Sequence, residues 1–134
     1  MMKILFVCYG NVARSQMAEA YYNKYTDSSR AKSCGVGYGI ADRYIHPAGD
    51  VAKVMLEEGI DISKKTVKPI TKELVEDAQK IIVMCHLEDC PKYLLDSGKA
   101  EHIPIPDPFG ISIEYTRNVR DEIKRLVLDL IHED

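Results

Sequence analysis

The sequence predicts one α/β domain in which a small parallel sheet of about four strands carries helices on both faces. Three observations lead to this fold class. Short, continuous apolar runs alternate with segments of helical periodicity, no repeat or linker-like stretch interrupts them, and a chain of 134 residues suits one domain. We therefore expect a single domain over residues 1–134, which binds its ligand at the carboxyl ends of the strands.

The first half of the chain predicts two strands and two helices. The run K-I-L-F-V at 3–7 is the continuous apolar segment that a strand buried on both faces requires. A helix of about three turns begins near Ser15. A second strand covers 31–34, and after a turn rich in glycine Pro47 is suited to be the first residue of a helix that ends at Gly59.

The second half predicts two more strands and a long helix. Residues 81–84 form a buried strand, and 102–105 form a weaker one that neighbouring prolines confine to the edge of the sheet. Apolar residues at helical spacing between 115 and 131 predict a long final helix with one apolar face.

Charge and hydropathy exclude several classes of protein. The chain has 18 Lys+Arg against 21 Asp+Glu and no basic stripe, so nothing favours a nucleic acid or a membrane as partner. The apolar run at 4–8 is too short for a signal peptide or a membrane span. We expect a cytoplasmic protein whose cysteines, Cys8, Cys34, Cys85 and Cys90, serve chemistry, metal binding or packing rather than disulfides.

The loop after the first strand, C-Y-G-N-V-A-R-S at 8–15, is the most informative segment. Gly10 and Asn11 are residue types that tolerate left-handed backbone, so the amides of residues 9–14 can turn inward and form an anion-binding nest. The helix that begins near Arg14 adds its free N–H groups and partial positive charge at the same point.

A thiol at the mouth of such a nest is favoured as the thiolate, which makes Cys8 a nucleophile. Arg14 can hold two oxygens of a tetrahedral oxyanion, and Ser15 can donate a hydrogen bond to the sulfur. The alternative is that Cys8 is a small buried apolar residue and Arg14 a surface residue of the helix. The residues predicted to bind phosphate are Tyr9, Gly10, Asn11, Val12, Ala13, Arg14 and Ser15.

These motifs resemble the low-molecular-weight protein tyrosine phosphatase superfamily, which includes the thioredoxin-coupled arsenate reductases. The likeness is strongest in the loop at 8–15 and continues in S-C-G at 33–35, His-Pro at 46–47, G-I-D-I-S at 59–63 and Asp-Pro at 107–108. The resemblance implies a phosphatase that hydrolyses phosphotyrosine-like monoesters through a phosphocysteine intermediate on Cys8.

Phosphoryl transfer to Cys8 needs a carboxylic acid that protonates the leaving group and then activates water. Asp107 is the candidate, because the prolines around it stiffen a loop after the last strand and the resemblance gives its Asp-Pro pair this role. The alternative is an ordinary turn aspartate before proline.

The resemblance also implies roles around the site. Phe109 would line the pocket beside the substrate ring, with Tyr9 as another wall, while Asn11 and Ser33 would brace the loop. The alternatives are a half-exposed loop aromatic for Phe109 and simple turn hydrogen bonding for Asn11 and Ser33.

Cys85 and Cys90 support a second chemistry, because arsenate has nearly the geometry of phosphate. In arsenate reductases that resemble this chain, a second cysteine attacks the nucleophile after arsenite forms, and a third resolves the disulfide for thioredoxin. Cys8, Cys85 and Cys90 would be that relay, and Q-M-A-E at 16–19 also resembles the reductases. Two departures count against it: the gap between Cys85 and Cys90 is shorter than in the reductase pattern, and residues 109–131 resemble the phosphatase ending.

Simpler interpretations of Cys85 and Cys90 remain open. They can be two buried or half-buried thiols flanking a strand end, and a zinc site with His86 lacks any recognised spacing.

The sequence therefore leaves three functions from different classes. The first is the phosphatase, with a phosphorylated protein or a small aryl phosphate as its substrate and no cofactor or metal. The alternative is the arsenate reductase, with thioredoxin as its partner. The third is a silent phosphate- or phosphotyrosine-binding module, which the presence of Cys8, Arg14 and Asp107 disfavours.

Overall fold

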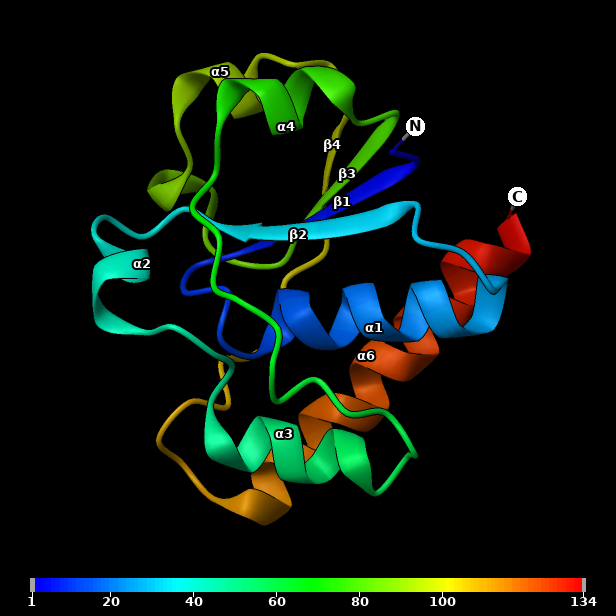
Figure 1. Cartoon of the computed structure of the whole chain (residues 1–134). Helices are drawn as coiled ribbons and strands as arrows, with labels where there is room; N and C mark the ends of the chain where they lie inside the picture. Colours follow the sequence, from blue (N-terminus) through cyan, green and yellow to red (C-terminus); the bar gives the residue numbers. More distant parts are fainter. Residues whose placement is uncertain (1, 134) are drawn as a thin grey trace.

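The computed structural model describes residues 2–133, so the two end positions of the domain predicted over 1–134 lie outside the described residues. Within the described part, four parallel strands form one sheet in the order β2-β1-β3-β4. Helices cover both of its faces (Figure 1), which confirms the predicted fold class. The strands are β1 (Ile4–Cys8), β2 (Ala31–Gly35), β3 (Lys80–Val83) and β4 (Ala100–His102).

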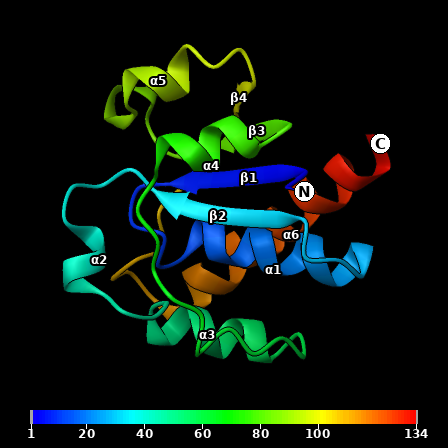
Figure 2. The ribbon, with the colours of Figure 1, turned by 45° about the horizontal axis from the view of Figure 1, so that its top comes forward.

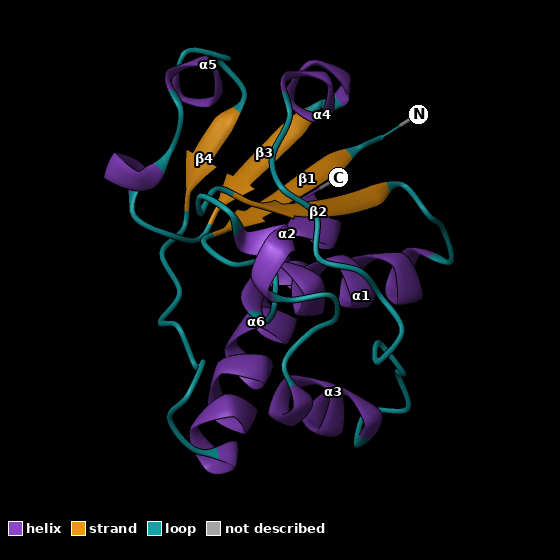
Figure 3. Ribbon diagram, turned by 60° about the vertical axis from the view of Figure 1, so that its left-hand side comes forward, coloured by secondary structure: helices purple, strands orange, loops and turns teal. Residues whose placement is uncertain are grey.

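Two apolar layers hold the helices against the sheet, because successive strand residues point to opposite faces. Ile4 and Phe6 face one layer, and Leu5 and Val7 face the other. The larger layer lies under α1 (Arg14–Thr26), α3 (Gly49–Leu56) and α6 (Ile113–Glu133), and the smaller one under α4 (Lys72–Asp77) and α5 (Lys92–Leu95). Figure 3 shows these two groups of helices on opposite sides of the sheet.

The first three strands agree with prediction to within one residue, and β4 lies two to three residues earlier than predicted. β4 begins at Ala100 rather than at residue 102, but its pairing with β3 extends further. The amide of Ile103 donates to the carbonyl of Val83 (2.9 Å) and that of Ile105 to the carbonyl of Met84 (3.1 Å). β4 is an edge strand, as the prolines after it predict.

The prediction that a helix begins at Pro47 is wrong, because α3 begins at Gly49. The amide of Ala48 donates instead to the carbonyl of Val12 at 3.0 Å, which ties the chain to the loop at 8–15 before the helix starts. Gly59 follows the helix with a φ of 76°, in agreement with its predicted place at the end.

Three short helices escaped prediction: α2 (Ile40–Arg43), α4 and α5, together with the 3₁₀ turn η1 (Leu87–Asp89). None is long enough to show a helical period in the sequence. Among residues 2–133 no helix has the length and apolar character that crossing a bilayer requires.

Candidate active site

The loop that joins β1 to α1 lies at the carboxyl edge of the sheet (Figure 2), where ligands of such sheets bind. We call residues 8–15 the phosphate loop. Asn11 has a φ of 54°, whereas Gly10 is not among the described residues with positive φ. Of the two residues expected to tolerate left-handed backbone, Asn11 is therefore the one that adopts it.

Asn11 is fully buried and organises the loop from behind. Its amide nitrogen donates to the hydroxyls of Ser15 (2.7 Å) and Ser33 (3.0 Å). Its oxygen accepts from the Gln16 side chain (3.1 Å) and from the backbone amide of Lys68 (2.8 Å). These four bonds connect the phosphate loop with α1, β2 and the chain after α3, so the conformation of the loop depends on these three segments.

The Cys8 thiol lies at the mouth of this loop with two donors beside it. The backbone amide of Asn11 donates to its sulfur at 3.2 Å, and the hydroxyl of Ser15 lies 2.8 Å away. Because that hydroxyl oxygen already accepts from Asn11, its own hydrogen is free to point at the sulfur. Both donors are therefore placed to hydrogen-bond to the sulfur of Cys8.

The start of α1 leaves its amides available to a ligand. Its N-cap is Ala13, whose side chain cannot accept a hydrogen bond from them. Free amides and the helix dipole then favour an anion at this end.

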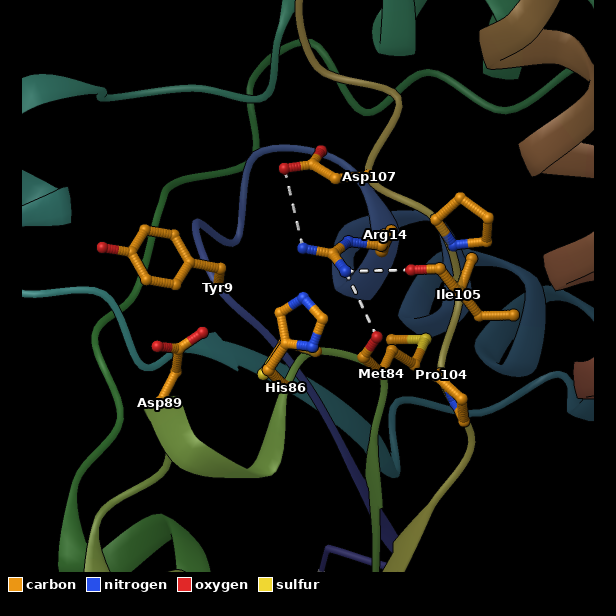
Figure 4. Close-up of a pocket in the computed structure, with 10 residues that line it drawn as sticks. Tyr9, Arg14, Met84, His86, Asp89, Pro104, Ile105 and Asp107 are labelled. Carbon is orange, nitrogen blue, oxygen red and sulfur yellow. Dashed lines mark hydrogen bonds and ion pairs between the residues drawn. The ribbon is translucent and has the colours of Figure 1, made fainter.

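Arg14, the first residue of α1, is buried with its guanidinium held by two backbone carbonyls (Figure 4). One of its terminal nitrogens donates to the carbonyls of Met84 (3.2 Å) and Ile105 (3.0 Å), at the ends of β3 and β4. The other lies 3.7 Å from a carboxylate oxygen of Asp107. The fork is thus fixed on its inner side and presents its outer side to the site.

Asp107 faces Arg14 from the loop after β4 and is half-exposed. Its other carboxylate oxygen accepts from the amide of Phe109 at 3.0 Å, which is the turn hydrogen bond expected of aspartate before proline. One carboxylate therefore forms the turn and also approaches the site, so the two interpretations of Asp107 are compatible.

A recess of about 210 Å³ opens over Cys8. We call it the aromatic recess. Tyr44 and Phe109 meet in its wall with their rings edge to face, 5.6 Å between centroids. Arg14 and Asp107 reach into it from one side. The remaining lining residues are Tyr9, Gly10, Val12, Ala13, Ile40 and Arg43.

A second cavity of about 400 Å³ adjoins the first and shares Tyr9, Arg14 and Asp107 with it (Figure 4). We call it the thiol cavity, because Cys85 is among its lining residues. Cys90 is not among them. The other residues that line it are Met84, His86, Asp89, Pro104, Ile105 and Pro106.

The cysteines outside the phosphate loop lie in apolar surroundings. All four cysteines of the chain are free thiols. Burial raises the pKa of Cys85 to about 12 and also raises the pKa values of Cys34 and Cys90. Cys34 is fully buried in β2 and packs against the smaller apolar layer. Within residues 2–133, no three or more His, Cys, Asp or Glu residues are grouped to hold a metal ion, and this covers the combination of Cys85 and Cys90 with His86.

Sequence reasoning missed several contributors to the site. Gln16, which braces Asn11, was noted only as a likeness to reductases, and Tyr44 and Arg43 of the aromatic recess gave no signal. The glycine-rich turn was a signal for close approach to the phosphate loop. A Cβ on Gly35 would lie 2.7 Å from the carbonyl oxygen of Tyr9, and one on Gly37 would lie 2.8 Å from its ring.

Fold and site together define an α/β domain that presents a cysteine within an oxyanion-binding loop. The chain belongs to the family described as low molecular weight phosphotyrosine protein phosphatase, whose sequence model matches residues 3–133. The family includes arsenate reductases among its members, and both kinds of member are enzymes.

Named sequence relatives of the chain are arsenate reductases. The chain is 34% identical to a glutaredoxin arsenate reductase of Synechocystis sp., over 98% of this chain and 97% of the relative. It is also 34% identical to arsenate reductase 2 of Staphylococcus haemolyticus, over 92% of each chain.

Similar solved structures include both a phosphatase and an arsenate reductase. A low molecular weight protein tyrosine phosphatase from T. tengcongensis matches with a TM-score of 0.83 and 27% identity over the full length of both chains. An arsenate reductase in the phosphate binding state matches with a TM-score of 0.79 and 31% identity, over 99% of this chain and 98% of that one.

Proposed function

We propose that this protein is a phosphatase that hydrolyses phosphotyrosine-like monoesters through a phosphocysteine on Cys8. The observation that carries the proposal is the aromatic recess, which the rings of Tyr44 and Phe109 line together with Cys8. A planar leaving group needs apolar walls beside the nucleophile. Arsenate has no organic group, so it has no use for such walls.

The phosphate loop supplies the charge complement. In this proposal the amides of residues 9–14 and the outer side of the Arg14 guanidinium bind the three equatorial oxygens of the phosphoryl group. Their positions are fixed before substrate arrives, by the four bonds of Asn11 and by the carbonyls that hold Arg14. Donors fixed in advance stabilise developing negative charge without a cost of reorganisation.

The reaction would proceed in two displacements. The Cys8 thiolate attacks phosphorus and the bond to the ester oxygen breaks, while Asp107 gives its proton to that oxygen. Asp107, now a carboxylate, takes a proton from water, which attacks the phosphocysteine and releases inorganic phosphate and the Cys8 thiolate. The half-exposed position of Asp107 on the aromatic recess supports this role, since it lies where both the leaving group and water can reach it.

Hydrolysis of p-nitrophenyl phosphate tests the proposal. The wild-type protein should release nitrophenol, and Cys8→Ser should abolish the activity, because the hydroxyl is a much weaker nucleophile than a thiolate. Cys34→Ala is the matched control, since it removes a thiol that lines neither cavity. No hydrolysis by wild type, or equal hydrolysis by Cys8→Ser, would refute the assignment.

The thiol cavity favours arsenate reduction as a second candidate function. Cys85 lines a cavity together with Arg14 and Asp107, which also line the aromatic recess over Cys8. In this chemistry the Cys8 thiolate first bonds to arsenate with loss of water. Cys85 then attacks the Cys8 sulfur, so that a disulfide forms and arsenite leaves with the electron pair that reduces As(V) to As(III). Cys90 next attacks Cys85, releasing the Cys8 thiolate, and thioredoxin reduces the Cys85–Cys90 disulfide.

Arsenate-dependent oxidation of NADPH in the presence of thioredoxin and thioredoxin reductase tests the second candidate. Cys85→Ser and Cys90→Ser should each abolish turnover, while Cys34→Ala should retain it. If wild type oxidises no NADPH with arsenate, or if both serine variants still do so, the relay is wrong.

A further inference from the structure

The segment at 36–48 is tied to the phosphate loop at both ends. The amide of Gly37 donates to the carbonyl of Tyr9 at 2.8 Å, and that of Ala48 donates to the carbonyl of Val12 at 3.0 Å. Figures 1 and 2 both show this segment, with α2 in it, beside the loop that follows β1. These two backbone hydrogen bonds therefore hold the segment beside the phosphate loop, which begins at Cys8.

α2 has one buried anchor. Ile40 is only 4% exposed and forms a small apolar cluster with Val12 of the phosphate loop and Val67. Arg43 is three residues later on the same short helix, and residues three apart share one side of a helix. The anchor thus sets the position of Arg43 at the aromatic recess, which it lines together with Cys8.

In the described chain, three other arginines form ion pairs with carboxylates, and Arg43 does not. Arg14 approaches Asp107 at 3.7 Å, and Arg117 and Arg120 both bind Glu57, at 2.8 and 2.7 Å. No carboxylate of residues 2–133 forms an ion pair with Arg43.

The recess therefore carries an unneutralised cation at its edge. Asp107, which also lines it, is committed to Arg14 and to the amide of Phe109. An exposed guanidinium is well suited to bind a carboxylate through two parallel N–H groups.

We propose that Arg43 is a specificity-determining residue that binds a second anionic group of the substrate. The inference rests on the proposed phosphatase function and names its substrate class: phosphotyrosyl peptides with aspartate or glutamate next to the phosphotyrosine. The phosphate is held in the loop, the phosphotyrosine ring lies against the wall that Tyr44 and Phe109 form, and the neighbouring carboxylate reaches Arg43. Among the described residues, Arg14 and Arg43 are the cations that line the aromatic recess. The phosphate itself would engage Arg14, so Arg43 is left for the second anionic group.

Binding to Cys8→Ser protein tests this inference without turnover. Three phosphotyrosyl peptides, identical except for Glu, Gln or Lys beside the phosphotyrosine, are titrated by fluorescence anisotropy. The Glu peptide should bind roughly 3- to 10-fold more tightly than the Gln peptide, as expected for one half-exposed charged pair. Raised ionic strength should shrink the ratio.

In the Cys8→Ser, Arg43→Gln double variant the charged pair is gone. The ratio of the affinity for the Glu peptide to that for the Gln peptide should therefore fall to about one and stay below roughly 3-fold. Arg43→Glu should reverse the preference, so that the Lys peptide binds best, an outcome that loss of structure cannot produce. Arg30→Gln, which removes an exposed arginine that lines neither cavity, is the matched control and should keep the ratio.

Equal binding of the Glu and Gln peptides, no binding of either, or a preference that survives Arg43→Gln would overturn the assignment of Arg43. Hydrolysis of p-nitrophenyl phosphate by wild type reports separately on the proposed function. A protein that binds the Glu peptide selectively but hydrolyses nothing would refute the phosphatase and leave Arg43 as the selecting residue. Hydrolysis of p-nitrophenyl phosphate without selection of the Glu peptide would support the phosphatase and refute the role of Arg43.

Discussion

Asn11 is the residue at which stability and site geometry are most closely coupled, and its replacement by alanine should be costly. The change removes bonds to Ser15, Ser33, Gln16 and the Lys68 amide. Gln16 keeps its bond to a carbonyl, so three bonds are lost without replacement, at about 1 kcal/mol each. A further cost of about 1 kcal/mol arises because alanine must adopt the positive φ. We expect the free energy of unfolding to fall by about 4 kcal/mol.

Asn11→Gly separates the two contributions. Glycine loses the same three bonds but accepts the left-handed conformation, so the glycine variant should be more stable than Asn11→Ala by about 1 kcal/mol. Urea unfolding followed by circular dichroism measures both values, provided that the slope of the free energy against urea is unchanged.

Asn23 offers a matched control on α1. Its side chain makes two bonds, to the amide and the carbonyl of Ala31, from within the regular helix. Asn23→Ala should cost about 1–2 kcal/mol, and Asn23→Gly about 1 kcal/mol more, because glycine destabilises a helix interior. The order of alanine and glycine is thus opposite at the two sites. The reasoning would be refuted if the free energy of unfolding of Asn11→Ala were within about 1 kcal/mol of wild type. It would also be refuted if Asn11→Gly were less stable than Asn11→Ala.

Three further predictions concern the site and the helices behind it. Asp107→Asn should lower kcat for p-nitrophenyl phosphate by roughly 100-fold or more, since general acid catalysis contributes that much, and an unchanged kcat would remove the residue from the mechanism. Tyr44→Ala should raise KM for aryl phosphates by roughly 3- to 10-fold, the value of one aromatic contact. Inhibition by inorganic phosphate should stay constant, because phosphate does not reach the ring. If aryl phosphate binding and phosphate inhibition weakened in parallel, the aromatic recess would not be the site of the substrate ring. Arg117 and Arg120 bind Glu57 and lower its pKa to about 2. Because the folded pKa lies below the unfolded one, this pairing stabilises the protein above about pH 4.5 and is lost as the pH falls toward 2. Thermal unfolding of Glu57→Gln should depend less on pH in that window, and an identical pH dependence would refute the ion pair.

The phosphate loop and the sheet around it could be predicted because their information is local. An apolar run, then Gly10 and Asn11, then the start of a helix are consecutive in the chain, and each is a local signal for strand, turn or helix. Asn11 has the left-handed conformation and Gly10 does not, and β1 ends at Cys8, one residue later than predicted. The edge position of β4 was readable for the same reason, from the prolines that follow it.

The contacts that aim Arg14 could not be predicted in the same way. They come from the backbone carbonyls of Met84 and Ile105, 70 and 91 residues away in the sequence. Any residue supplies a carbonyl, so no side chain marks these positions. Tyr44 and Arg43 escaped for a different reason, because α2 is a single turn whose place depends on the buried Ile40 and on bonds to the phosphate loop.

The two cavities place different groups beside the same phosphate loop. The phosphate loop and Arg14 recognise only a tetrahedral oxyanion, so they do not distinguish an ester from a free anion. Selection must come from what borders them. On one side, aromatic rings accept the organic part of an ester, and on the other, Cys85 offers a second thiol. Since burial keeps Cys85 protonated at neutral pH, a reductase would have to activate it, whereas a phosphatase requires nothing of it. The aromatic recess already stands beside Cys8, and on this ground we propose hydrolysis ahead of arsenate reduction.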